Sequence, residues 1–161
     1  MLFSVLFAAA ALLAGAIAAV TGFGIGSLLT PLLALQVGTK LAVAAVAIPH
    51  FVGSAQRFWM FRRHVDRRVV LGFQVPKESF VATATAIALF VDVARLPVYL
   101  ATQGREIIGW WRLLLAATVA IMVGTMLGTR LLSRLPQHGF RRVVAVLLLL
   151  LGLYMITAGS G

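Results

Sequence analysis

The sequence predicts an all-α, polytopic transmembrane helical bundle of about four or five spanning helices plus a glycine-broken half-helix. Two observations support this fold class. The 161 residues are 61% hydrophobic and only 11% charged, whereas a soluble domain carries about 25% charged residues. The apolar residues also form segments close to the roughly 20 residues that a helix needs to cross the hydrocarbon of a bilayer. We therefore expect one membrane domain surrounded by lipid.

The first apolar segment runs from Leu2 to Val20 and is followed by Gly22-Phe23-Gly24-Ile25-Gly26-Ser27-Leu28-Leu29-Thr30-Pro31. Glycine costs a helix about 1 kcal/mol relative to alanine, and proline about 3 kcal/mol. Irregular backbone at membrane depth is tolerated only where protein covers it or where it lines a cavity. We expect a broken helix here, followed by a half-helix over 27–37. Residues 1–37 form either a re-entrant hairpin or a crossing helix plus this half-helix.

Further spanning segments are expected at 41–61, 80–100, 110–132 and 143–156, with a loop at 101–109. The segment at 110–132 contains Gly124 and Gly128 in a small-xxx-small pattern, which lets two membrane helices pack closely.

The net charge of +10 comes mainly from two basic clusters between apolar segments, at 57–68 and 130–142. An excess of Lys and Arg marks cytoplasmic loops, so we expect both clusters inside and a multi-pass protein of the inner (cell) membrane. Because the basic residues lie in short loops and form no continuous basic face, we expect no nucleic-acid partner. The chain has no cysteine, which excludes disulfides and thiolate metal sites.

Two stretches of the chain match at an offset of 38 residues. Gln36-Val37 corresponds to Gln74-Val75, Val43-Ala44 to Val81-Ala82, and Arg57 to Arg95. Internal duplication is common in secondary transporters. We interpret 1–68 as a first repeat unit and 69–161 as a partial second unit that lacks a counterpart of the glycine break.

Asp92 and Arg95 lie inside a predicted spanning segment, where a charge costs about 2.5–3.5 kcal/mol on insertion scales. They are either a self-neutralising structural pair, or Arg95 binds an anion while Asp92 orients it or carries a proton. His50 is either a packing residue or a proton relay.

The remaining candidates are hydroxyls and the break itself. Ser27 and Thr30 either cap the half-helix or bind an anion at its positive end. Thr83 either bonds a backbone carbonyl or offers its hydroxyl to a substrate. The predicted substrate-binding set is Gly22, Gly24, Gly26, Ser27, Thr30, Pro31, Thr83 and Arg95. No nucleophile–base pair, carboxylate dyad or metal-ligand cluster stands out, so we expect no enzyme, metal or cofactor.

Two groups of motifs resemble the TauE/SafE (TSUP) family of sulfite and organosulfur exporters. The first is the glycine break with Leu29-Thr30-Pro31, then Lys40-Leu41-Ala42-Val43-Ala44 in a helix that ends in Phe61-Arg62-Arg63. The second is 75–85 with Asp92, Arg95, Pro97 and Tyr99. Family members are usually longer, so the chain looks like a shortened form that lacks a central block near 68–70.

The resemblance implies a permease that exports a small anion, such as sulfite or an organosulfonate, by alternating access. The anion would lie between 27–30 and the helix that bears Thr83 and Arg95. The alternative is a non-transporting or remnant membrane subunit that functions only as an oligomer, or not at all. A homodimer would restore two half-sites.

Overall fold

The structure is a computed structural model, which describes residues 2–64 and 76–136 together with 138–140, 142, 145, 146 and 149. Its elements are α1 (Leu2–Thr21), α2 (Ile25–Val37), α3 (Thr39–Phe61), the short 3-10 helix η1 (Arg62–His64), α4 (Lys77–Gly109) and α5 (Trp111–Arg134). Helices α1, α4 and α5 are long and apolar enough to cross a membrane, and α3 is 23 residues long. The predicted helical bundle is confirmed.

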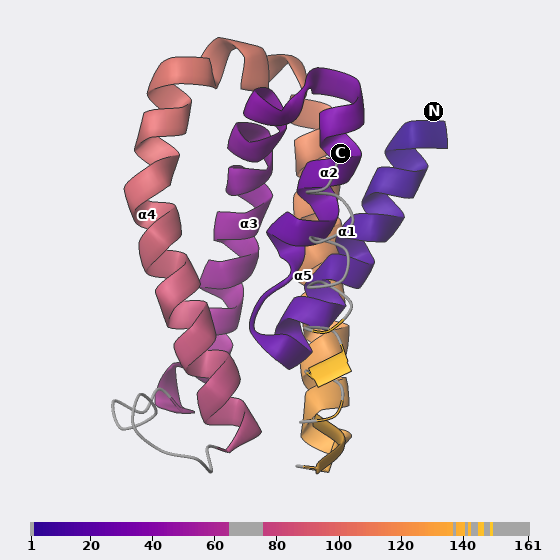
Figure 1. Cartoon of the computed structure of the whole chain (residues 1–161), viewed down its shortest axis with the longest axis vertical. Coiled ribbons are helices and arrows are strands. Elements are labelled where there is room, and N and C mark those ends of the chain that lie inside the picture. Colours follow the sequence, from indigo (N-terminus) through magenta and orange to yellow (C-terminus); the bar gives the residue numbers. More distant parts are fainter. Residues whose placement is uncertain are drawn as a thin grey trace.

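The chain runs up and down the bundle (Figure 1). Helix α1 crosses it, α2 returns from the break, α3 descends, α4 ascends and α5 descends again. The 13 residues of α2 make a helix of about 20 Å, which is shorter than the roughly 30 Å of hydrocarbon in a bilayer. The start of α1 and the end of α2 lie at the same end of the bundle (Figure 1). Whether residues 1–37 form a re-entrant hairpin or a crossing helix plus a half-helix stays a prediction.

The predicted loop at 101–109 is wrong, because α4 continues through it as one 33-residue helix. Gln103 and Ile107 are buried on the inner face of this stretch, so the helix still packs against the bundle there. A helix of this length is about 50 Å long, and Figure 1 shows its upper part turning across the end of the bundle. The predicted final segment at 143–156 lies mostly outside the described residues.

Helices α1 and α5 approach each other through glycines. A Cβ atom on Gly124 would lie 2.0 Å from the carbonyl oxygen of Leu12, and one on Gly128 would lie 2.4 Å from that of Ala16. Gly15 of α1 is equally close to Ile121 of α5. The predicted close packing at Gly124 and Gly128 is confirmed, and α1 and α5 form one tightly packed pair.

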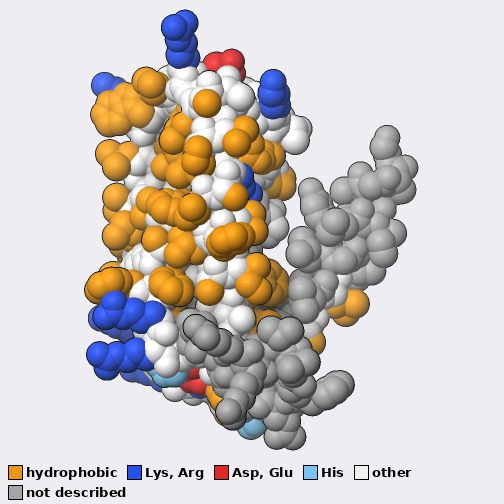
Figure 2. Space-filling view, turned by 90° about the vertical axis from the view of Figure 1, so that its left-hand side faces the viewer, with side chains coloured by type: hydrophobic (Ala, Val, Ile, Leu, Met, Phe, Trp, Pro, Cys, Tyr) orange, Lys and Arg blue, Asp and Glu red, His pale blue; other side chains and the backbone are white. Residues whose placement is uncertain are grey.

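The outer surface of α4 is apolar while its inner face is polar. Phe90 is 78% exposed and Ile87 62%, whereas Asp92 on the same helix is fully buried. Figure 2, which faces the α4 side, shows most charged side chains at the two ends of the molecule, with a largely apolar surface between them that a basic side chain interrupts about halfway along. This arrangement is the one expected where the solvent around the helices is lipid.

One end of the bundle carries most of the described basic residues. Arg62 and Arg63 extend from α3, Arg130 and Arg134 end α5, and Lys77 begins α4. The Lys77 ammonium donates to the carbonyl of Leu132 at 2.7 Å and also to that of Leu135. A cation bonded to the last carbonyls of a helix satisfies them and complements its dipole. This contact ties the start of α4 to the end of α5.

Helices α3 and α4 begin 38 residues apart, at Thr39 and Lys77, which is also the separation of Arg57 and Arg95. The two helices run in opposite directions (Figure 1). The division into repeat units at 68 and 69 stays a prediction, and it falls outside the described residues.

The glycine contact between α1 and α5 makes a prediction with an internal control. We expect Gly124→Ala to destabilise the protein by about 1–3 kcal/mol, because the new methyl group overpacks the interface. Gly104→Ala is the control, since nothing lies within 4 Å of a Cβ there and alanine favours a helix by about 1 kcal/mol. Thermal unfolding in detergent measures both. Equal melting temperatures for the two variants would contradict the close contact.

Candidate functional site: a buried polar network beside the glycine break

The inner face of α3 carries three polar side chains, His50, Ser54 and Arg57, at a spacing that places them on one side of the helix. Arg57 is fully buried. Its Nη2 donates to Ser54 Oγ at 3.1 Å, and that oxygen lies 3.5 Å from His50 Nδ1. Nε and Nη1 of Arg57 have no hydrogen-bond partner among the described residues. A buried guanidinium thus retains two nitrogens with N–H groups to donate.

Helix α4 completes the network with Asp92 and Arg95. Asp92 Oδ2 lies 2.6 Å from His50 Nδ1, and Oδ1 lies 2.6 Å from Arg95 Nη2. The ion pair that the spacing of Asp92 and Arg95 allows is therefore present, and His50 joins it. With Asp92 ionised, Nδ1 of His50 holds the proton and donates it to the carboxylate, which leaves Nε2 for another partner.

The glycine break lies directly against this network. A Cβ on Gly26 would meet His50 Cδ2 at 3.8 Å, and one on Gly22 would meet the Ala84 methyl of α4 at 2.7 Å. Gly53 of α3 faces both Ile25 Cδ1 and Arg57 Nη1. The break therefore lies between the middle of α3 and the first half of α4.

The break has a backbone that requires glycine. Gly22 and Gly24 have φ values of +83° and +123°, in the region that residues with a side chain rarely adopt. Thr21 steadies the turn, because its hydroxyl lies 2.7 Å from the carbonyl oxygen of Phe23. Helix α2 then starts at Ile25, so its positive N-terminal end opens beside the network.

Two threonines of α4 lie near the level of Arg57. His50 and Asp92 are in contact, so they lie at the same level of the bundle. The two helices are antiparallel and both rise about 1.5 Å per residue. Arg57 comes seven residues after His50 and Thr85 seven residues before Asp92, so these two are also level with each other. The hydroxyls of Thr83 and Thr85 are buried, with no hydrogen-bond partner among the described residues. Thr85 lies on the same face of α4 as Asp92, seven residues later, whereas Thr83 points to another side of the helix. Thr85 therefore offers a further donor on the network side of α4.

The network carries an excess of positive charge. Arg57 and Arg95 are cations, whereas Asp92 is the one carboxylate in contact with the network among the described residues. Keeping a net cation away from water at membrane depth is costly unless an opposite charge accompanies it. The geometry therefore suits a small anion with several acceptor oxygens.

The other predicted site residues fall into two groups, the glycines of the break and the residues further along α2. Gly22, Gly24 and Gly26 belong to the break, beside the network. Ser27 is exposed and its hydroxyl donates to the carbonyl of Gly24 at 3.0 Å. Pro31 is also exposed, one turn later, and Thr30 is half-buried. Whether any of these residues binds an anion stays a prediction.

Arg57 is the residue that sequence reasoning missed. The predicted cytoplasmic loop at 57–68 is wrong at its start, because Arg57 lies inside α3 and is buried. Two signals pointed to it: its spacing from His50 on a helix, and its match with Arg95 at an offset of 38. Arg67 and Arg68 of the same loop lie outside the described residues.

No group of three or more His, Asp or Glu side chains that could hold a metal occurs among the residues that the structure describes.

Comparison with known proteins gives one match. A family model described as "Sulfite exporter TauE/SafE" matches the chain at 7–76 and again at 69–155. The two matched regions meet at 69–76, beside the position at 68–70 where the sequence predicts a missing block. No curated protein and no solved structure matches the chain significantly.

The contact between the break and α4 can be tested by comparing two glycines. Gly22 and Gly38 both have positive φ, so an alanine at either position costs about 1–3 kcal/mol of backbone strain. Only at Gly22 does the new methyl group also meet α4, since nothing lies within 4 Å at Gly38. We expect Gly22→Ala to lower the melting temperature further than Gly38→Ala. Equal losses would show that the break does not touch α4.

The ion pair makes a second prediction. Asp92→Asn should cost about 3–5 kcal/mol, because it leaves buried cations without their carboxylate. Adding Arg95→Gln should recover part of that loss, since residues in one network couple by about 0.5–3 kcal/mol. Glu106→Gln is the control, an exposed carboxylate whose loss should change stability by less than about 0.5 kcal/mol. Additive losses for the double variant in detergent unfolding would contradict the pairing.

Proposed function

Because the chain belongs to the TauE/SafE sulfite exporter family, we propose that it is a membrane permease that exports a small anion, such as sulfite or an organosulfonate. The observation that carries the proposal is Arg57, a fully buried guanidinium with two nitrogens that lack partners among the described residues. A guanidinium binds oxyanions through a planar fork of two parallel N–H···O bonds.

The other groups around Arg57 suit the same ligand. The first N–H groups of α2 point out of the helix at the break, and a helix N-terminus favours an anion. The hydroxyl of Thr85 would donate from the side of α4 that also carries Asp92. Asp92 forms an ion pair with Arg95. Because its negative charge offsets part of the positive charge of the site, the anion would bind weakly enough to be released.

Proton coupling would use His50. Its Nδ1 bonds Asp92, while the Cδ2 edge of the ring faces Gly26 in the break. A proton taken up at Nε2 would add a positive charge when the anion is present and lose it on release. This role rests on the position of the ring between the carboxylate and the break.

Alternating access would use the contrast between the two halves of the bundle. Helices α1 and α5 are locked by their glycine contacts, while α3 and α4 carry the polar network. The flexible glycine backbone at Gly22–Gly24 connects α1 to α2 and would act as the hinge. The end with most of the basic residues would face the cytoplasm, following the positive-inside rule.

A homodimer is favoured by the surroundings of Arg95. Its side chain is 31% exposed, and α4 packs mainly on α3 among the described helices. An exposed guanidinium near the bilayer centre is costly in lipid. The corresponding Arg57 of α3 is fully buried beside the break, whereas no described half-helix precedes α4. A second copy would cover Arg95 and supply the missing half-site. The shortened chain would therefore function as a homodimer.

Anion flux into proteoliposomes tests the permease directly. We expect Arg57→Gln to raise the KM for sulfite about 10- to 100-fold, because hydrogen bonds to a charged group contribute about 1.5–3 kcal/mol. Arg63→Gln, at an exposed position in η1, should leave the flux unchanged. Folding of each variant is checked by its melting temperature. Flux that is absent from the wild-type chain, or equal in both variants, would reject the proposal.

The dimer can be tested by cross-linking, because the natural chain has no cysteine. Val91→Cys, one turn before Arg95 on the same side of α4 and at an exposed position, should form a disulfide-linked dimer on oxidation in membranes. Leu115→Cys, at an exposed position on α5, is the matched control and should remain monomeric. The opposite pattern, or a chain that is monomeric in native mass spectrometry, would contradict a dimer through α4.

A further inference from the structure

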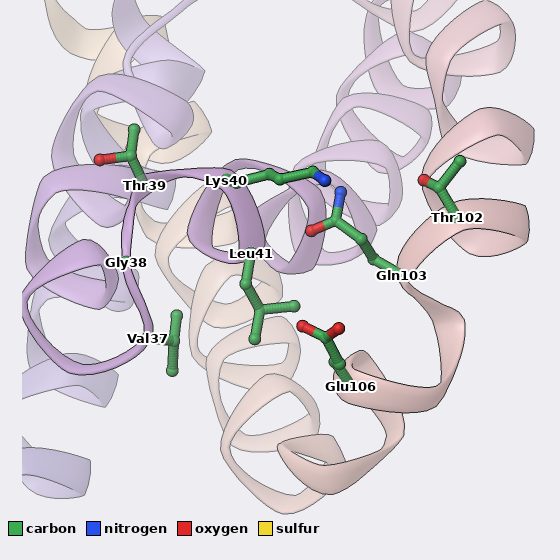
Figure 3. A pocket seen from close by; sticks show the side chains of 8 residues that line it. All are labelled: Val37, Gly38, Thr39, Lys40, Leu41, Thr102, Gln103 and Glu106. Carbon is green, nitrogen blue, oxygen red and sulfur yellow. The ribbon is translucent and has the colours of Figure 1, made fainter.

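A cavity lies at the end of the bundle opposite the basic residues, where α2 turns into α3 and α4 crosses above them. Its volume is about 260 Å³, just below the range of about 300–1,000 Å³ of drug-sized pockets. Lys40 and Leu41 line it from α3, and Thr102, Gln103 and Glu106 line it from α4. Figure 3 shows the side chains of Lys40, Gln103 and Glu106 extending into this space from the two helices. None of them belongs to the central network.

One side of the cavity is built for a negative group. Helix α3 begins here, after Gly38, whose φ of 78° ends α2 and starts α3 without an intervening loop. The first backbone N–H group of α3 that finds a partner within the helix is that of Ala42, which bonds the Gly38 carbonyl. The N–H groups of Thr39, Lys40 and Leu41 therefore have no carbonyl partner within this 23-residue helix. They lie at its positive end, at the cavity and beside the Lys40 ammonium.

The other side of the cavity is built for a hydrogen-bond donor. Gln103 is only 7% exposed, and its Oε1 has no hydrogen-bond partner among the described residues. A buried amide oxygen without a donor is costly and is rare in native structures. Glu106, one turn further along α4, adds a carboxylate that forms no ion pair within the described part of the chain. Both groups accept hydrogen bonds.

The geometry points to a second ligand site in this cavity for a small zwitterion, a molecule with an acid group and an ammonium group a few bonds apart. The acid group lies against Lys40 and the start of α3, and the ammonium donates to Gln103 Oε1 and Glu106. An acid without an amine leaves Gln103 and Glu106 unpaired, and an amine without an acid leaves Lys40 unpaired. The site is separate from the central anion site and does not depend on transport.

The test is a calorimetric titration of the full-length protein in detergent with three probes of matched size. These are 3-aminopropanoate, propanoate and propylamine, which carry both groups, the acid alone and the amine alone. We expect 3-aminopropanoate to bind at least tenfold more tightly than either of the others. Lys40→Met and Glu106→Gln should each weaken its binding at least tenfold. Gln103→Leu should weaken it as well, with its melting temperature as the check on folding.

Arg105→Gln is the matched control, an exposed charge beside Glu106 in the sequence that does not line the cavity. It should bind 3-aminopropanoate as the wild type does. Equal affinities for the three probes, no binding of any probe, or binding that survives both Lys40→Met and Glu106→Gln would each overturn the inference. Binding that Arg57→Gln abolishes while Lys40→Met preserves would place the ligand in the central site and would also overturn it.

Discussion

The structure depends on keeping the charged side chains of α3 and α4 away from lipid: Arg57 and Asp92 are fully buried, and Arg95 is covered over about two thirds of its side chain. A single charge at the bilayer centre costs at least about 2.5–3.5 kcal/mol, so α3 and α4 must pack with their polar faces together. His50 joins the two helices through the Asp92 carboxylate. The apolar residues of α4 consequently face outward, the reverse of a soluble helix. Two cations against one carboxylate leave a net positive charge, and the anion that we propose as the ligand would balance it.

Glycine has two separate roles around this network. In α1 and α5, Gly15, Gly124 and Gly128 allow close approach of two backbones, which fixes one half of the bundle. In the break, Gly22 and Gly24 supply positive φ values, which bring the start of α2 beside Arg57 and His50. Helix α1 belongs to the closely packed pair and leads directly into the break at its C-terminal end. A substrate held there would contact a helix end whose position the glycine backbone can change.

The sequence predicted the fold well, whereas the binding role of the predicted site residues stays a prediction. Segment length and hydropathy identified the spanning helices, and the three glycines with Pro31 identified the break. The loop at 101–109 was wrongly predicted, because the burial of Gln103 and Ile107 that continues α4 depends on tertiary packing. Arg57 was assigned to a basic loop because it adjoins Arg62 and Arg63 in the sequence. The contact between His50 and Asp92 joins residues 42 positions apart in the sequence. It could not be predicted from local patterns, because it depends on how α3 packs on α4.

We expect the excess positive charge beside the break to bind a small oxyanion. The most direct test of this expectation is a crystal structure of the protein soaked in selenite, which has the shape and charge of sulfite and scatters anomalously. An anomalous peak should lie within hydrogen-bond distance of the Arg57 guanidinium, between the break and α4. Peaks confined to the exposed arginines at the basic end, with none beside Arg57, would contradict it.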